Sequence, residues 1–188
     1  MKAKMKTRGA RTVFLALVAT LVAALMAGGA FAAHKRGGPE MYRANLNPVP
    51  HDPAADSGSN VSGDVKLWLK GDNELKVRLK AWGASPNLPH AMHIHGKEAA
   101  GEIAMCPGAD RRDDIVNDGL IETAEGLPDY GGILVSFTLF GDTSPMSALA
   151  LDRFPVAKQN GLLKYKRTFD IPTNVANRLD ELHIVVHG

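Results

Sequence analysis

Three of the chain's seven histidines lie within six residues, at positions 90, 93 and 95. In an extended strand successive side chains point to opposite faces, so His93 and His95 share a face, roughly 7 Å apart along the backbone. Imidazole is the commonest metal ligand in proteins, so this spacing predicts a metal site. The alternative is a polar strand end whose histidines bind no metal. His90 joins the ligand set only if Pro89 marks a bend.

A second pair of histidines occurs in the last apolar run, residues 182–188. His183, Val185 and His187 share one face if this run is a strand. Should the run lie beside the His93/His95 strand, His187 completes a three-imidazole site with an open position, which suits copper or zinc. His183 would lie roughly 13 Å from His187 along the strand and is therefore not expected to bind the same ion.

The acidic segment 114–125 has the spacing of an EF-hand calcium loop. Hard oxygen ligands suit calcium, and Gly119 stands where such a loop turns sharply. Val116 occupies the third position and offers no side-chain ligand, so the alternative is a solvated acidic loop. A bound calcium ion would have a structural role in a long insert. The predicted calcium ligands are Asp114, Asp118, Leu120 (through its carbonyl oxygen), Glu122 and Glu125.

Cys106 is the chain's single cysteine, so no disulfide forms within the chain. It could be a free thiol, an intermolecular bridge or a soft metal ligand. A buried, inert thiol is the expected state, because free cysteine behaves as a small hydrophobic residue.

The N-terminal segment predicts export. Residues 1–11 carry five basic residues and no acid, 13–26 is apolar apart from Thr20, and Ala30-Phe31-Ala32 fits a cleavage site. We therefore predict a signal peptide over 1–32, a linker over 33–40 and a secreted or extracytoplasmic domain over 41–188. No membrane span would remain after cleavage; an uncleaved anchor is the alternative. Cleavage would leave 17 of the 22 basic residues against 20 acids, which argues against a nucleic-acid partner.

Alternation of apolar and polar residues predicts antiparallel strands. The clearest case is a hairpin, 65–70 and 75–82, joined by a turn at 71–73. Its outer face is cationic, which suits either an anionic partner or, more simply, a solvated surface that blunts strand pairing. Short strands without a long amphipathic helix predict an all-β sandwich or barrel. Further strands are expected at 41–46, 91–96, 132–139, 162–169 and 182–188.

These motifs resemble those of a known superfamily. His93-Ile94-His95, a long loop and then Val185-Val186-His187 resemble the copper/zinc superoxide dismutases, and the segment 91–96 is similar to exported bacterial CHRD-type proteins. The resemblance implies an antiparallel Greek-key β-sandwich with a long acidic loop insertion. It also implies that His93, His95 and His187 bind copper, with zinc less favoured.

The chain departs from the dismutase pattern between its two motifs. Residues 96–182 contain no histidine, so of the zinc ligands only Asp152 has a counterpart. The family's active-site arginine would follow the last strand, which suggests that the domain is truncated after Gly188. The expected function is a non-enzymatic exported domain that binds a transition metal ion. The alternatives are a copper-dependent superoxide dismutase-like oxidoreductase and a cell-surface interaction module without metal.

Overall fold

The structure, a computed structural model, describes residues 38–55, 60–98 and 101–188. Residues 38–188 form one compact unit. The predicted signal peptide and the linker residues 33–37 lie outside the described residues. Among those described, no helix is both long and apolar enough to cross a membrane.

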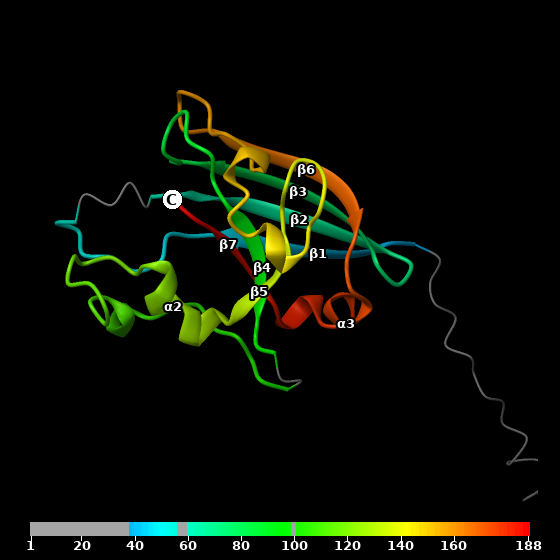
Figure 1. Cartoon of the computed structure of the whole chain (residues 1–188), viewed down its shortest axis with the longest axis horizontal. Coiled ribbons are helices and arrows are strands. Elements are labelled where there is room, and N and C mark those ends of the chain that lie inside the picture. Colours follow the sequence, from blue (N-terminus) through cyan, green and yellow to red (C-terminus); the bar gives the residue numbers. More distant parts are fainter. Residues whose placement is uncertain (1–37, 56–59, 99–100) are drawn as a thin grey trace, which may run out of the picture. The chain divides into compact units, whose positions relative to one another are not determined.

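Seven strands and two short α-helices make up the unit (Figure 1). The strands are β1 (Glu40–Leu46), β2 (Ser62–Lys70), β3 (Glu74–Trp82), β4 (Met92–Gly96), β5 (Gly132–Ser136), β6 (Leu163–Asp170) and β7 (His183–Val186). The helices are α2 (Thr123–Tyr130) and α3 (Thr173–Ala176). Single 3₁₀ turns lie at Ala109–Arg111, Pro145–Ser147, Leu151–Arg153 and Leu179–Glu181.

The strands form two antiparallel sheets, ordered β1-β2-β3-β6 and β5-β4-β7. After β3 the chain crosses to the second sheet, forms β4 and β5, and returns to place β6 beside β3. The all-β sandwich predicted from the alternation is therefore confirmed, and so is the 65–82 hairpin.

The core lies between the inner faces of the two sheets. The alternating apolar residues of β2 and β3, such as Val65 and Val77, are buried there, as are Met92 and Ile94 of β4. Because side chains alternate along a strand, burying Met92 and Ile94 in the core turns His93 and His95 to the opposite, outer face of their sheet. The register of β4 is thus fixed by its apolar residues.

Several local predictions were wrong in detail. The strand predicted over 132–139 ends at Ser136, and residues 97–129, expected to be irregular, contain most of α2. At the short helix α3 the N-cap residue is Pro172, and no side chain caps the helix. These errors concern short elements, whose ends depend on tertiary contacts more than on local sequence.

Candidate metal centre

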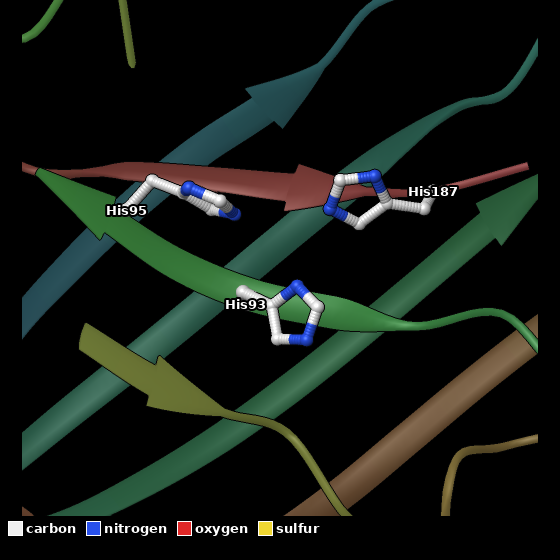
Figure 2. A group of neighbouring side chains, drawn as sticks. All are labelled: His93, His95 and His187. Atoms are coloured by element: carbon white, nitrogen blue, oxygen red, sulfur yellow. The ribbon is translucent and has the colours of Figure 1, made fainter. Parts of the chain in front are cut away.

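The structure brings His93, His95 and His187 together on the outer face of the three-stranded sheet. One ring nitrogen of each lies within 4.8 Å of those of the other two, and they form the one group of three or more metal-ligating side chains within the described residues. Figure 2 shows the three rings turned toward a common region. The pairing of β4 with β7 positions the three rings. Just beyond β7, the backbone N–H of His187 donates to the Ala91 carbonyl at 2.8 Å.

Each histidine uses one ring nitrogen to contact a nearby oxygen. His95 Nδ1 lies 2.9 Å from the Gly131 carbonyl, His93 Nε2 lies 3.2 Å from the Ala148 carbonyl, and His187 Nδ1 lies 3.3 Å from Thr123 Oγ1. A carbonyl oxygen only accepts hydrogen bonds, so the facing nitrogens of His93 and His95 must carry the proton. The other nitrogen of each neutral ring then carries the lone pair that binds metals.

The nitrogens left over are the ones a metal would need. His93 Nδ1, His95 Nε2 and His187 Nε2 are buried and have no hydrogen-bond partner. A buried polar atom without a partner is costly, so three in one cluster call for an explanation. Two nitrogens on one tetrahedral or trigonal ion lie roughly 3.3–3.6 Å apart, since each bond is about 2.0–2.1 Å long. Ring rotations that shift the nitrogens by roughly an ångström would meet that distance.

Burial keeps these imidazoles uncharged at neutral pH. It lowers the pKa of His93 to about 4 and that of His187 to about 4, and it also lowers the pKa of His95. Desolvation is the largest cause in each case, and the positive charge that a neighbouring ring would carry adds to it. A neutral imidazole is the form that binds metal, so no proton has to be displaced near pH 7.

Two loops cover this site from the solvent side. The 97–131 insert supplies Gly131 and Thr123, and its Tyr130 ring packs edge-on against His95 at 4.7 Å between ring centroids. From the other side Phe154 packs edge-on against His93 at 5.4 Å. His93 and His95 are 2% and 1% exposed and His187 is half-buried, so the two loops enclose most of the site.

Position 131 requires a glycine. It ends α2 at a φ of 80°, and a Cβ there would collide with the carbonyl of Gly96. Its own carbonyl orients His95. Sequence reasoning missed Gly131, Thr123 and Ala148. The Gly131-Gly132 pair was the available signal for a helix end, whereas a contact through the backbone carbonyl of Ala148 has no sequence signature.

The structure gives His90 and His183 other roles than metal ligation. The ring nitrogens of His90 lie 2.9 Å from the His187 carbonyl and 3.0 Å from that of Ser85, so neither faces the cluster. His183 is the cross-strand neighbour of His95, but its Nε2 lies 2.8 Å from the Ala104 carbonyl and its Nδ1 lies 3.6 Å from Cys106 Sγ. Cys106 is exposed, which corrects the expectation of a buried thiol.

A cavity of about 420 Å³ lies beside β7 and the end of β1. His90, Cys106 and His183 line part of it, and the three clustered histidines do not. A second cavity of about 250 Å³, between Tyr42 and Ile184, does not reach them either. Neither cavity therefore connects the clustered nitrogens to solvent.

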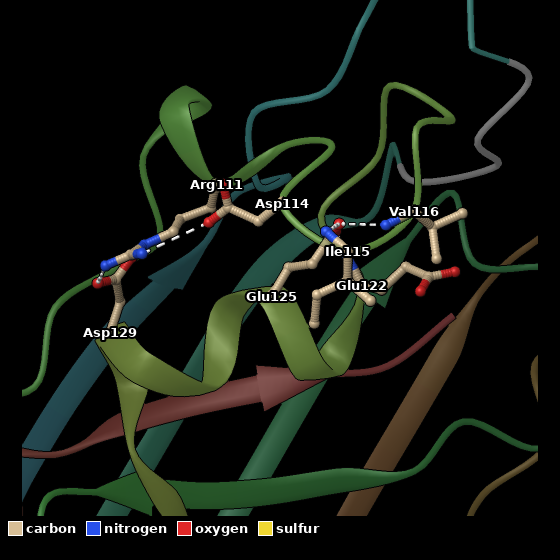
Figure 3. Close-up of polar contacts among 7 residues, drawn as sticks. All are labelled: Arg111, Asp114, Ile115, Val116, Glu122, Glu125 and Asp129. Carbon is tan, nitrogen blue, oxygen red and sulfur yellow. Dashed lines mark hydrogen bonds and ion pairs between the residues drawn. The ribbon is translucent and has the colours of Figure 1, made fainter.

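The acidic residues of the predicted calcium loop do not converge. Glu125 is 1% exposed, and its carboxylate accepts hydrogen bonds from the backbone N–H groups of Ile115, Val116 and Glu122 (Figure 3). These bonds lower the pKa of Glu125. Glu125 is the third residue of α2 and forms a capping box with Glu122, the N-cap residue. Glu125 thus has a different role from the calcium ligand that its spacing predicts.

The other members of that loop are also engaged within the insert. Asp114 forms an ion pair with Arg111 at 3.5 Å, and Asp118 accepts the Leu120 N–H. Arg111 also binds both carboxylate oxygens of Asp129 at 2.8 Å (Figure 3). No group of three metal-ligating side chains forms among Asp114, Asp118, Glu122 and Glu125, all of which the structure describes. The insert is therefore held by hydrogen bonds and ion pairs of its own.

No protein-family model, curated protein or solved structure matches this chain.

Proposed function

We propose that this chain is an exported, non-enzymatic β-sandwich domain that binds one copper ion through His93, His95 and His187. The observation that carries the proposal is the set of three buried ring nitrogens without partners. Three neutral imidazoles suit copper or zinc, and copper binds nitrogen ligands more tightly than zinc does. When bound, copper supplies a redox-active cation, and the chain's own residues orient the rings and exclude water.

The orientation comes from the oxygens behind the rings. The carbonyls of Gly131 and Ala148 fix which nitrogen of His95 and of His93 is free, and the Thr123 hydroxyl contacts Nδ1 of His187, as such outer contacts do around metal sites. Enclosure by the insert supports a binding role over a catalytic one, because neither described cavity would bring a substrate to the ion. The same enclosure favours slow exchange of the ion with solvent.

Metal analysis and calorimetry of purified residues 33–188 test this proposal. We expect one copper per chain and an affinity that falls at least about 100-fold in His95→Gln, since a first ligand matters more than its outer contacts. His51→Gln is the matched control, because His51 contacts the Val49 carbonyl and lies outside the cluster. Absence of stoichiometric copper, or equal loss in both variants, would refute the copper site and leave the interaction module without metal.

A copper-dependent superoxide dismutase-like oxidoreductase is the second candidate. Three imidazole ligands would leave a coordination position open, which redox chemistry requires. Superoxide removal by the copper-loaded chain, with and without a chelator, separates the two functions. Chelator-sensitive activity absent from His95→Gln would favour the oxidoreductase over the non-enzymatic domain.

Export and family membership are further parts of the proposal. Residues 1–32 have the pattern of a signal peptide, and the spacing of the two histidine motifs supports a relationship to the CHRD-type and superoxide dismutase-like proteins. N-terminal sequencing of the protein recovered outside the cytoplasm should begin at Ala33. Recovery of the intact Met1 terminus would instead support an uncleaved anchor.

A further inference from the structure

The outer face of the four-stranded sheet carries a two-dimensional array of cations. Strand register places Arg43, Lys66, Arg78 and Lys166 directly opposite one another, in one row that crosses all four strands. The row on one side contains Lys80 and Lys164, and the row on the other side contains Lys76. These seven residues are called the cationic face: Arg43, Lys66, Lys76, Arg78, Lys80, Lys164 and Lys166.

Little negative charge balances this array. Within its three rows Asp64 is the one carboxylate, opposite Lys80. The ion pairs of the described residues involve none of the seven cations. Lys66 is half-buried, whereas the other six are exposed. Residues 38–188 contain 15 of the chain's 22 basic residues and all 20 acidic ones, so outside the cationic face eight basic residues stand against 20 acidic residues.

Protection of a sheet edge does not explain the array. Cations on edge strands discourage unwanted strand pairing, but Lys66, Lys76, Arg78 and Lys80 lie on β2 and β3. Both are central strands whose backbone groups are already paired on each side. Like charges directly opposite each other also destabilise a sheet. Repulsion among the cations of β2 and β3 therefore lowers the stability of the sheet at positions where no edge needs protection.

Large apolar side chains lie on the same face as the cations. Trp82 is 44% exposed and Met41 is 51% exposed, and Trp68 lies between Met41 and Lys76 in the third row. The ammonium of Lys80 lies 4.4 Å from the Trp82 ring centre, and that of Lys76 lies 5.3 Å from the Trp68 ring centre. Lysine combined with tryptophan is typical of protein faces that lie on lipid headgroups.

We propose that the cationic face docks onto a bilayer surface rich in anionic phospholipids. Neighbouring strands are about 4.8 Å apart, and alternate residues on one strand about 7 Å apart, so the charges extend in two directions. A planar array of headgroups can contact all three rows together, whereas a linear polyanion follows one row at a time. The long lysine and arginine side chains can adjust to the twist of the sheet. This inference does not depend on copper binding.

Vesicle co-sedimentation of residues 33–188, which include the whole compact unit, tests the proposal. We expect little binding to phosphatidylcholine vesicles and binding that increases with the phosphatidylglycerol fraction and decreases with salt. In Lys66→Gln/Arg78→Gln the affinity should fall about 30-fold, the equivalent of roughly 1 kcal/mol for each cation removed. Arg112→Gln/Lys158→Gln, which removes two cations elsewhere, should bind nearly as well as the unchanged chain.

The double variant at the cationic face relieves a like-charge contact, so its melting temperature should not fall, and weaker binding cannot then be attributed to unfolding. Equal binding to neutral vesicles, or equal loss in both double variants, would overturn the proposal. So would tight binding to heparin or duplex DNA without binding to anionic vesicles, because the partner would then be a linear polyanion.

Discussion

The basic side chains on the outer faces of the two sheets lie in opposite environments, one covered and the other exposed. The face of β5-β4-β7 is covered by the 97–131 insert and the 137–154 connection; its three clustered histidines are uncharged near pH 7, His93 and His95 being buried and His187 half-buried. No described segment covers the face of β1-β2-β3-β6, where six of the seven cations are exposed and Lys66 is half-buried. The covering loops therefore decide what each face can bind: an ion within the first, an anionic surface against the second.

Acidification should affect the covered face most. The pKa of His93 and of His187 is about 4 in the folded chain, whereas an unfolded histidine titrates near 6.5. Between these values the unfolded chain binds more protons, so stability falls as pH decreases from about 6.5 to 4. The expected loss is on the order of 3 kcal/mol for each histidine, at 1.36 kcal/mol per pKa unit.

Urea unfolding of the metal-free chain at several pH values measures this loss. His93→Gln/His187→Gln should show a flatter pH dependence, since two of the buried titrating groups are gone. A stability that is constant from pH 7 to 4.5 would show that the histidines are not buried in their neutral form. The comparison between the two faces would then lose its basis.

Removing an outer contact of the cluster should weaken metal binding without removing a ligand. In Thr123→Val the hydroxyl facing His187 Nδ1 is lost, and copper affinity should fall about 10- to 100-fold. Thr168→Val is the control, because Thr168 lies exposed on the opposite sheet, beside Lys76. Calorimetric titration with copper measures both. An unchanged affinity in Thr123→Val would mean that this hydroxyl does not orient the ring.

Removing the hydrogen bonds that hold the insert should destabilise the side of the molecule that it covers, the outer face of β5-β4-β7, and not the cationic face. Glu125→Ala leaves three backbone N–H groups without their acceptor, so the melting temperature should fall by roughly 5 °C or more. Glu122→Ala, which keeps the Glu125 carboxylate, should have a smaller effect. Added calcium should leave the unchanged chain's melting temperature as it is, because the Glu125 oxygens already accept hydrogen bonds. A large rise with calcium would restore the calcium-loop interpretation.

The smallest expected effect is on the uncovered face. Lys66→Gln/Arg78→Gln removes a directly opposed like-charge pair and should raise the free energy of unfolding by about 0.2–1 kcal/mol at low salt. The gain should shrink as salt screens the charges. Chemical unfolding at two salt concentrations measures it. A loss of stability would mean that the side chains contribute more by packing on Trp68 and Trp82 than they cost by repulsion.

The sequence alone determined the strands and the direction in which their side chains point. Apolar alternation is a local pattern with period two, so it predicted the 65–82 hairpin and the shared face of His93 and His95. The same rule predicted the cationic outer face of that hairpin, but local pattern could not tell that Arg43, Lys164 and Lys166 extend it over four strands. The order of the strands follows from pairing between distant segments.

Only the tertiary structure decided whether the histidines meet. His95 and His187 are far apart in the chain, and their proximity depends on β4 pairing with β7. The tautomers of His93 and His95 depend on the carbonyl oxygens of Ala148 and Gly131, which come from two separate loops. The hydrogen bonds of Glu125 could not be predicted from the calcium-loop spacing for the same reason, since a carboxylate's partners depend on which donors the fold brings to it. The sequence determines the residue types and the period with which apolar residues alternate. The burial of a side chain and its hydrogen-bond partners depend on how distant segments pack together.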